Sequence, residues 1–325
     1  MKKLLAFIIL SVAAVSCYED YILDYVYTGI YFPYQIDVRT FVVGEGMKVE
    51  VGAALGGVRK NTIDREVTFR LDPTLVTPAI LAQMKGSPLT YIKDASVPVA
   101  ALQVMPSDYY TISSTSKMII KAGQHSGTVV VRPDSVNFLN DSLNTFYATY
   151  VLPFYIEKAD ADTVLENKRY NVVGFRFENM LYGNYWHGGV ARIERPGFPD
   201  SIFTYKTEIP TAEAKIWILK TNGPRTLACN GYLNQTTSKT EMILVLNGDK
   251  VQVGSAPGAT YVIEPEGEST FNRARLLQDR KIFLNYKYLN PGNGWTYHCT
   301  DTLRFRNRFR DGINEWQDEN PAHYN

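Results

Sequence analysis

Residues 241–253 have the sequence EMILVLNGDKVQV, in which an apolar run leads to Asn247-Gly248 and then to alternating charged and apolar residues. An Asn-Gly pair supplies the two positive-φ positions of a tight type I′ turn, and the segments on either side have the composition of β-strands. The stretch therefore predicts an antiparallel β-hairpin.

The rest of the C-terminal half repeats this pattern. Residues 215–220 lead into Thr221-Asn222-Gly223, and residues 281–289 lead through a Pro-, Gly- and Asn-rich turn at 290–294 into residues 295–306. The last segment alternates strictly between two faces. One face holds Trp295, Tyr297, Cys299, Leu303 and Phe305, and the other holds Thr296, His298, Thr300, Arg304 and Arg306. Successive hairpins over residues 179–325 predict an antiparallel barrel that closes its own edges.

The N-terminal half, residues 29–178, consists of short strand patterns separated by turns. Residues 67–71 alternate apolar with polar side chains, which is typical of a half-buried strand. One short helix is expected between Pro73 and Leu89, and the apolar run 145–156 is broken by Pro153, which suits an edge or a bulge. Short strands at regular spacing predict a β-sandwich, so the whole chain is expected to be all-β.

The first residues have the pattern of an export signal. Lys2 and Lys3 precede a short apolar run and small residues, which together predict a secretory signal peptide over residues 1–16. Ala14-Val15-Ser16-Cys17 resembles the bacterial lipobox, and the resemblance implies that Cys17 is acylated and anchors a tether over residues 17–28. Acidic residues follow in Tyr18-Glu19-Asp20, which resembles the signal that sends lipoproteins to the exterior face of the outer membrane; a periplasm-facing position is the alternative.

Composition narrows the classes of partner. The formal net charge is +1, and no basic stripe indicates nucleic-acid binding. Tyrosine is abundant, with 22 residues, which favours strands and also surfaces that stack on sugars. No catalytic motif was found, so we expect no enzyme, no cofactor and no metal site.

Two charged segments have a simple interpretation as solvated surface. Glu264, Glu266 and Glu268 alternate with Pro265 and Gly267, which predicts an exposed acidic loop, the alternative being a contact with calcium or sugar hydroxyls. Residues 304–310 place four arginines on one predicted strand face. They are expected to be solvated or paired with acidic residues on a neighbouring strand. The alternative is that they bind an acidic glycan.

An aromatic segment is the candidate ligand site. Tyr182, Tyr185, Trp186 and His187 precede Gly188-Gly189, and they either fill the barrel or form a platform on which a sugar ring stacks. In the second interpretation His187 or Asn184 supplies hydrogen bonds. Further candidates for stacking lie later in the chain, at Trp295 and Trp316.

The cysteines allow one disulfide. With Cys17 assigned to lipid, Cys229 and Cys299 remain, and an exported compartment permits a bond between them. The alternative is that Cys299, which alternates in phase with Tyr297 and Leu303, is a buried small hydrophobe.

A family resemblance draws these observations together. The chain resembles two-domain surface lipoproteins of uncharacterised function from the Bacteroidetes, of the type found in glycan-utilisation gene clusters. The resemblance rests on Tyr31-Phe32, Arg39-Thr40, the glycine-rich stretch 52–57, Asp72-Pro73, Asp108-Tyr109-Tyr110, Leu152-Pro153 and the segment 182–189. It implies an immunoglobulin-like domain over 29–178 and a lipocalin-like barrel over 179–325.

The function implied is non-catalytic binding of an oligo- or polysaccharide at the cell surface, beside outer-membrane transporter components. The alternative is a structural or adhesive lipoprotein that presents a protein-binding surface. A hydrolase is disfavoured because no catalytic motif is present.

Overall fold

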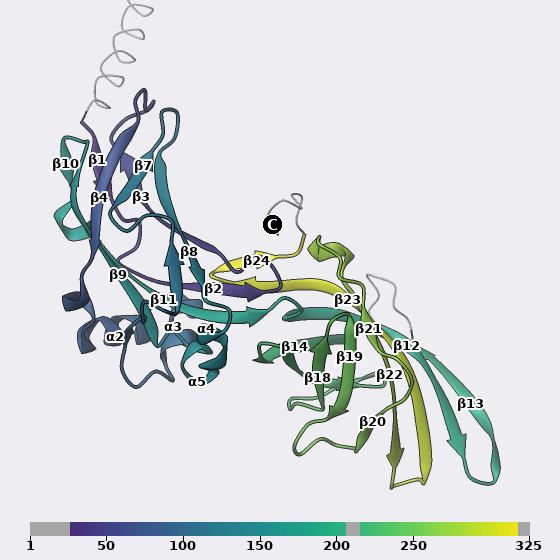
Figure 1. The fold of residues 1–325 in the computed structure, drawn as a ribbon. Helices are drawn as coiled ribbons and strands as arrows, with labels where there is room; N and C mark the ends of the chain where they lie inside the picture. Colours follow the sequence, from purple (N-terminus) through teal and green to yellow (C-terminus); the bar gives the residue numbers. More distant parts are fainter. Residues whose placement is uncertain (1–26, 206–214, 318–325) are drawn as a thin grey trace, which may run out of the picture.

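The computed structural model describes residues 27–205 and 215–317 as two β-rich units that lie side by side (Figure 1). The predicted all-β class is confirmed. The signal peptide, Cys17 and all but the last residues of the tether lie outside the described residues. No helix in the described part of the chain is long and apolar enough to cross a membrane.

Two sheets form the N-terminal unit. The first has the strand order β10 (Thr163–Val164), β1 (Gly29–Tyr31), β3 (Val49–Gly56), β8 (Ser126–Pro133) and β6 (Tyr110–Ile112). The second has the order β2 (Ile36–Val43), β11 (Tyr170–Asn179), β9 (Tyr150–Ala159), β4 (Arg65–Leu71) and β7 (Lys117–Ile120), and β5 (Gln103–Val104) also pairs with β9. Apolar side chains from both sheets meet in one core, where Phe41 stacks on Phe175 with ring centroids 5.3 Å apart.

Short helices cover the outer face of the second sheet (Figure 1). Helix α2 (Pro78–Lys85) follows the 3₁₀ turn η1 (Pro73–Leu75) and begins at Thr77, whose hydroxyl accepts a hydrogen bond from the Ile80 amide. This is the helix that the sequence predicts; α3 (Thr90–Ser96), α4 (Asn137–Asn140) and α5 (Ser142–Thr145) were not predicted. Apolar side chains of α2 and α3 form a second buried cluster with those of β2, β9 and β11, whereas Phe138 of α4 belongs to the core between the sheets.

Pro153 lies in the interior of its sheet, which corrects the expectation of an edge position. Strand β9 pairs with β4 as far as Phe154 and with β5 at Tyr150 and Val151. On this side of β9, Pro153 lies between the segment that pairs with β4 and the segment that pairs with β5. No described strand residue faces it there to accept a hydrogen bond from the amide that proline lacks.

The C-terminal unit is a closed ring of eight strands, because β12 pairs with β23 in addition to their neighbours in the sheet. The ring order is β12 (Gly183–Arg195), β14 (Lys215–Gly223), β15 (Thr226–Cys229), β18 (Met242–Asn247), β19 (Lys250–Ser255), β21 (Thr270–Phe271), β22 (Lys281–Asn290) and β23 (Trp295–Arg310). Four further pieces lie outside the ring: β13 (Phe198–Tyr205), β20 (Ile263–Pro265), β24 (Ile313–Glu315) and a hairpin of β16 (Gly231–Tyr232) with β17 (Gln235–Thr236).

The predicted hairpins are present, and two turns are shifted. Strand β14 continues through Gly223, which pairs with Thr226, so the first turn lies at Pro224 and Arg225 rather than at 221–223. Strands β18 and β19 pair antiparallel, but Asn247 pairs with Lys250. The turn residues are therefore Gly248, with φ +68°, and Asp249, one position later than predicted. Strands β22 and β23 pair antiparallel and are joined by a turn at residues 291–294, as expected.

Candidate functional site

The interior of the barrel is filled with side chains. Tyr185, Trp217 and Tyr286 are fully buried there. The hairpin β16–β17 packs against them so closely that a Cβ atom on Gly231 would lie 2.2 Å from the Trp217 ring. Two pockets, of about 570 and 530 Å³, lie instead at the two ends of the barrel.

A buried carboxylate organises this interior. Asp301 accepts a hydrogen bond of 2.6 Å from the Tyr286 hydroxyl and another from the Tyr205 hydroxyl. Burial, followed by the charge of Asp301, raises the pKa of both tyrosines, so both remain protonated donors. Asp301 lies between Cys299 and Leu303, so the alternation of β23 places it on the inward face.

His187 lies beside this carboxylate and is buried, so it does not form part of a platform. Its ring stacks on Trp217 with centroids 3.9 Å apart, and its Nε2 is 3.2 Å from Oδ2 of Asp301. The angles of this contact do not meet those of a hydrogen bond, and neither Nε2 nor Nδ1 of His187 has a hydrogen-bond partner among the described residues. His187 and Asp301 are both closed off from solvent, so the pair is structural.

Four tyrosines gather at the end of the barrel that is distant from the N-terminal unit; we call them the tyrosine cluster. Tyr288 stacks on Tyr261 at 4.8 Å and on Tyr297 at 4.9 Å between ring centroids. Tyr232 meets Tyr261 and Tyr288 edge-on at 5.4 and 5.6 Å. Offset and edge-on arrangements of this kind are the favoured ones for aromatic rings.

Hydrogen bonds from buried groups hold two of these rings in place. The carboxylate of Glu241, which is fully buried, accepts hydrogen bonds from the amide and the hydroxyl of Thr260, next to Tyr261. The Tyr286 hydroxyl accepts a hydrogen bond of 2.7 Å from the Leu233 amide, next to Tyr232. The cluster is therefore preorganised by buried hydrogen bonds, one of which, through Tyr286, connects it to Asp301.

A pocket of about 530 Å³ lies against the tyrosine cluster; we call it the distal pocket. Tyr261 forms its aromatic wall, supported from behind by Tyr288, which is stacked between Tyr261 and Tyr297. Glu264 and Lys287, 3.6 Å apart, contribute one charge of each sign. The remaining lining residues are Thr260, Val262, Leu289, Pro291 and Thr296. An aromatic wall beside hydroxyls and a balanced charge pair suits a neutral polyhydroxylated ligand.

The sequence-predicted site residues are not brought together. Tyr185 points into the barrel, while Trp186 points outward, with the Arg306 guanidinium 5.0 Å from its ring centroid. The Tyr182 hydroxyl donates to the carbonyl of Phe309 at the opposite end of the barrel from the tyrosine cluster.

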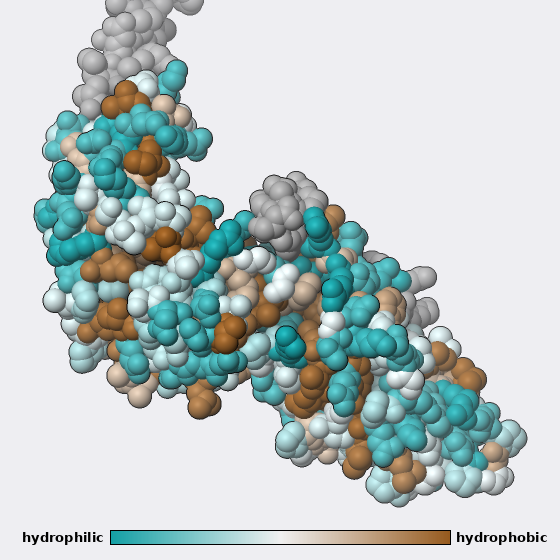
Figure 2. All heavy atoms as spheres, viewed as in Figure 1, coloured by the Kyte–Doolittle hydropathy of each residue, from teal (hydrophilic) through white to brown (hydrophobic). Residues whose placement is uncertain are grey.

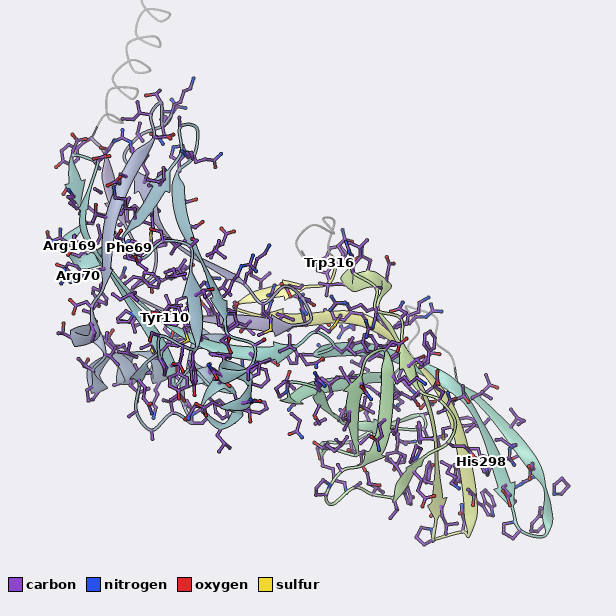
Figure 3. The ribbon with its side chains drawn as sticks, viewed as in Figure 1. Phe69, Arg70, Tyr110, Arg169, His298 and Trp316 are labelled. Atoms are coloured by element: carbon purple, nitrogen blue, oxygen red, sulfur yellow. The ribbon has the colours of Figure 1, made fainter. Side chains whose placement is uncertain are left out.

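The two later tryptophans are separated as well. Trp295 begins β23 at the distal end, where the Arg195 guanidinium lies 5.8 Å from its ring centroid. Trp316 is exposed and follows β24, well away from the labelled His298 of β23 (Figure 3). The six candidates therefore do not form one platform.

Both remaining cysteines are free and buried, so the structure does not contain the disulfide that the sequence permits. Burial raises the pKa of the Cys229 thiol to about 12. Cys299 occupies the inward phase of β23, in agreement with its alternative interpretation as a small buried hydrophobe.

The arginine-rich end of β23 does not present one face. The pairing of β12 with β23 shifts by one residue between Asn184 and Tyr185, which changes the phase of β23. Arg306 is exposed, whereas Arg308 is buried. Arg308 and Arg310 both pair with Glu315 of β24, the neighbouring-strand pairing that the sequence suggested as one alternative.

The acidic residues 264–268 are engaged by cations. Glu268 pairs with Lys250, and Glu266 lies 2.8 Å from Nδ1 of His298. Glu264 lies in β20 rather than in a loop. Residues 27–205 and 215–317 contain no group of three acidic, histidine or cysteine side chains placed to hold a metal ion.

Comparison with known proteins places the fold among proteins of unknown function. A family model described as a "-like, N-terminal domain" matches residues 25–163, less than half of the chain. A Bacteroides ovatus structure of unknown function is similar at 20% identity and a TM-score of 0.61, covering 90% of this chain and 98% of that one. This likeness shows the fold alone.

Two further solved structures are less similar to this chain. A second Bacteroides ovatus structure of unknown function has 13% identity and a TM-score of 0.40, covering 90% of this chain and 99% of that one. A Bacteroides ovatus multidomain protein including DUF1735 has 12% identity and a TM-score of 0.39, covering 89% and 100%. No curated protein matches the chain.

Proposed function

We propose that this protein is a non-catalytic glycan-binding lipoprotein of the cell surface and that its saccharide binds in the distal pocket. The observation that carries the proposal is the tyrosine cluster, where Tyr261, backed by Tyr288, forms the aromatic wall of a pocket of about 530 Å³. A volume of that order accommodates a small saccharide.

The chemistry of the pocket supports a sugar rather than a wholly apolar ligand. A pyranose has an apolar C–H face, which a tyrosine ring can cover, and a rim of hydroxyls. Thr260, Thr296, Glu264 and Lys287 supply donors and acceptors for such hydroxyls around the aromatic wall. Because the tyrosine cluster is held by Glu241 and Tyr286, little conformational entropy is lost when a ligand binds.

The arrangement of the two units suits display from a membrane. Strand β1, the first described strand, lies at the far end of the N-terminal unit, and the tip of the β22–β23 hairpin lies at the far end of the barrel (Figure 1). In the proposal, acylated Cys17 holds the chain in the outer membrane and the distal pocket faces outward. Outer-membrane glycan transporter components are then the expected neighbours.

The binding proposal is tested by screening the mature protein against capsule, mucin and plant polysaccharides, and then comparing two variants. Tyr261→Ala removes a ring of the pocket wall, whereas Tyr34→Ala removes an exposed ring from the N-terminal unit. Losing a stacking ring costs about 1 kcal/mol, so Tyr261→Ala is expected to weaken binding at least about fivefold. Tyr34→Ala should bind like the wild type; equal binding by all three proteins would refute the site.

The anchor has a separate test. Cys17→Ala should move the protein from the detergent-extracted membrane fraction to the soluble fraction, because acyl chains on Cys17 are the proposed attachment. Retention of the variant in the membrane would contradict the anchor without affecting the binding proposal.

One observation favours the structural or adhesive alternative. The β12–β13 hairpin extends beyond the barrel and exposes Phe198, Ile202 and Phe203. On the face drawn in Figure 2, however, apolar side chains form small groups among hydrophilic ones rather than one continuous patch. Absence of binding to every glycan, together with capture of a defined protein through this hairpin, would favour the alternative.

A further inference from the structure

A second pocket, of about 570 Å³, lies at the opposite end of the barrel, where the two units meet; we call it the junction pocket. Val43 and Gly44 at the end of β2, with Asn179 and Met180 after β11, form its wall on the side of the N-terminal unit. The barrel supplies the other wall from the β14–β15 turn, the β18–β19 turn and the loop between β21 and β22. Pockets between domains are common ligand sites.

The charged side chains of this pocket all have one sign. Four arginines line it, at positions 225, 273, 275 and 280, and no acidic side chain does. Arg225 comes from the β14–β15 turn, and Arg273 and Arg275 from the β21–β22 loop, so segments nearly fifty residues apart in the sequence place their cations around the same space.

Three of these cations are not neutralised. Arg225, Arg273 and Arg275 are exposed, and none forms an ion pair with a carboxylate of the described residues. Exposed Arg192, by contrast, pairs with Asp200 at 2.7 Å. The backbone of Arg273 also has a φ of +48°, a conformation that residues other than glycine rarely adopt.

Arg280 differs from the other three because it is buried and forms part of the framework. Its guanidinium lies 2.6 Å from Glu45 and donates a hydrogen bond to the carbonyl of Met180. Glu45 is thereby occupied by Arg280 and Arg308 and does not neutralise the exposed arginines. The Arg273 guanidinium lies 5.9 Å from the ring centroid of Phe271. The junction pocket thus has a fixed floor and a rim of three cations that no carboxylate of the described residues neutralises.

The rest of the lining is suited to an organic ligand. Met180, Leu246 and Phe271 supply apolar surface, and Gly248 keeps the β18–β19 turn small. Guanidinium groups bind carboxylate, sulfate and phosphate groups through paired hydrogen bonds. A ligand with both an anionic group and a ring would use both parts of the lining.

We infer that the junction pocket binds an anionic saccharide, with its carboxylate or sulfate group held by Arg225, Arg273 and Arg275. This site is chemically distinct from the distal pocket, whose charges balance, and it does not depend on the function proposed there. The chain then has two binding sites, one for a neutral sugar and one for an acidic sugar, at opposite ends of the same barrel.

Calorimetric titration of the mature protein with four probes tests the inference: a galacturonic acid disaccharide, a sulfated disaccharide, a neutral galactose disaccharide and inorganic sulfate. The inference expects at least one acidic disaccharide to bind more tightly than both the neutral disaccharide and inorganic sulfate. It also expects the affinity to fall at high salt, because the exposed cations are screened. Acidic disaccharides that bind no better than the neutral one overturn it, and so does equal binding of inorganic sulfate.

Variants locate the site. Arg225→Gln and Arg275→Gln should each weaken binding of the acidic disaccharide about tenfold, because each removes charge-assisted hydrogen bonds. Arg192→Gln, which changes the net charge equally at an exposed position far from the pocket, should bind like the wild type. If all three variants lose affinity for the acidic disaccharide equally, the effect is one of overall charge and the site is overturned. The site is also overturned if none of the three loses affinity.

The distal-pocket variant separates the two proposals. Tyr261→Ala should leave binding of the acidic disaccharide unchanged, since the junction pocket shares no lining residue with the distal pocket. A loss of acidic-sugar binding in Tyr261→Ala, with Arg225→Gln unaffected, would overturn the junction pocket and assign that ligand to the distal one. Melting curves equal to that of the wild type confirm that each variant is folded.

Discussion

Glu45 of the N-terminal unit and Arg308 of the barrel form a bidentate ion pair, with nitrogen–oxygen distances of 2.9 and 2.8 Å. Both side chains are almost completely buried, and Arg280 lies 2.6 Å from the same carboxylate. Asp311 adds a second link, because it accepts hydrogen bonds from the amide and the hydroxyl of Thr40. These contacts join the two units by buried charges rather than by a flexible linker.

Removal of the charge on Glu45 is expected to destabilise the protein strongly. Glu45→Gln removes the carboxylate that pairs with buried Arg280 and leaves Arg308 with Glu315 alone. Removing one partner of a buried ion pair costs about 3–5 kcal/mol. Glu66→Gln is the control, because Glu66 pairs with Lys117 at an exposed site and such pairs contribute less than about 1 kcal/mol. Urea denaturation of both variants measures the difference; equal stabilities would contradict the role of the buried pair.

The same carboxylate predicts part of the acid sensitivity. Burial opposes its charge, but the hydrogen bonds and charges of Arg308 and Arg280 outweigh burial and hold the pKa of Glu45 below its usual value of 4.5. The ion pair therefore contributes fully above about pH 4.5, and its contribution is lost as the pH falls through the lower pKa of the folded state. The free energy of unfolding should fall more steeply in this acid range for the wild type than for Glu45→Gln. Parallel curves would show that Glu45 does not titrate in this way.

Close packing in the barrel makes one glycine essential. Gly231→Ala would place a Cβ atom 2.2 Å from the Trp217 ring, and overpacking of a core costs typically about 1–3 kcal/mol. Gly254→Ala is a matched control in strand β19, where an added Cβ meets nothing within 4 Å. Thermal unfolding should separate the two variants clearly. A Gly231→Ala protein as stable as Gly254→Ala would mean that the β16–β17 hairpin does not pack against Trp217.

The two buried thiols should be unreactive in the folded protein. The pKa of Cys229 is raised to about 12 by burial, and burial also raises the pKa of Cys299, so little thiolate is present at neutral pH. Iodoacetamide should modify both only after unfolding, which mass spectrometry of the mature protein detects. Recovery of a peptide with Cys229 bonded to Cys299 would instead restore the disulfide that the sequence permits.

Local patterns in the sequence predicted the hairpins because strand alternation and turn residues act over short distances. The pairing of Tyr288 with Tyr297 could also have been predicted from the sequence, because the turn at 291–294 fixes the register of β22 against β23. The inward position of Asp301 followed from the same alternation, but a charged residue was not expected in the core.

Other features could not be predicted from local patterns. The phase of β23 changes at a register shift against β12, which turns Arg308 inward toward Glu45, 263 residues away in the chain. Tyr232 reaches the tyrosine cluster from the short strand β16 and Tyr261 from the loop before β20. The positions of these segments depend on hydrogen bonds to Tyr286 and Glu241. The junction pocket likewise joins residues from both units.

A crystal structure of the mature protein with its tightest-binding neutral oligosaccharide tests the central claim most directly. The account predicts a sugar ring in the distal pocket, with its apolar face against Tyr261 and its hydroxyls bonded to Glu264 or Lys287. A saccharide bound away from the tyrosine cluster, for example against Trp186 or Trp316, would contradict it.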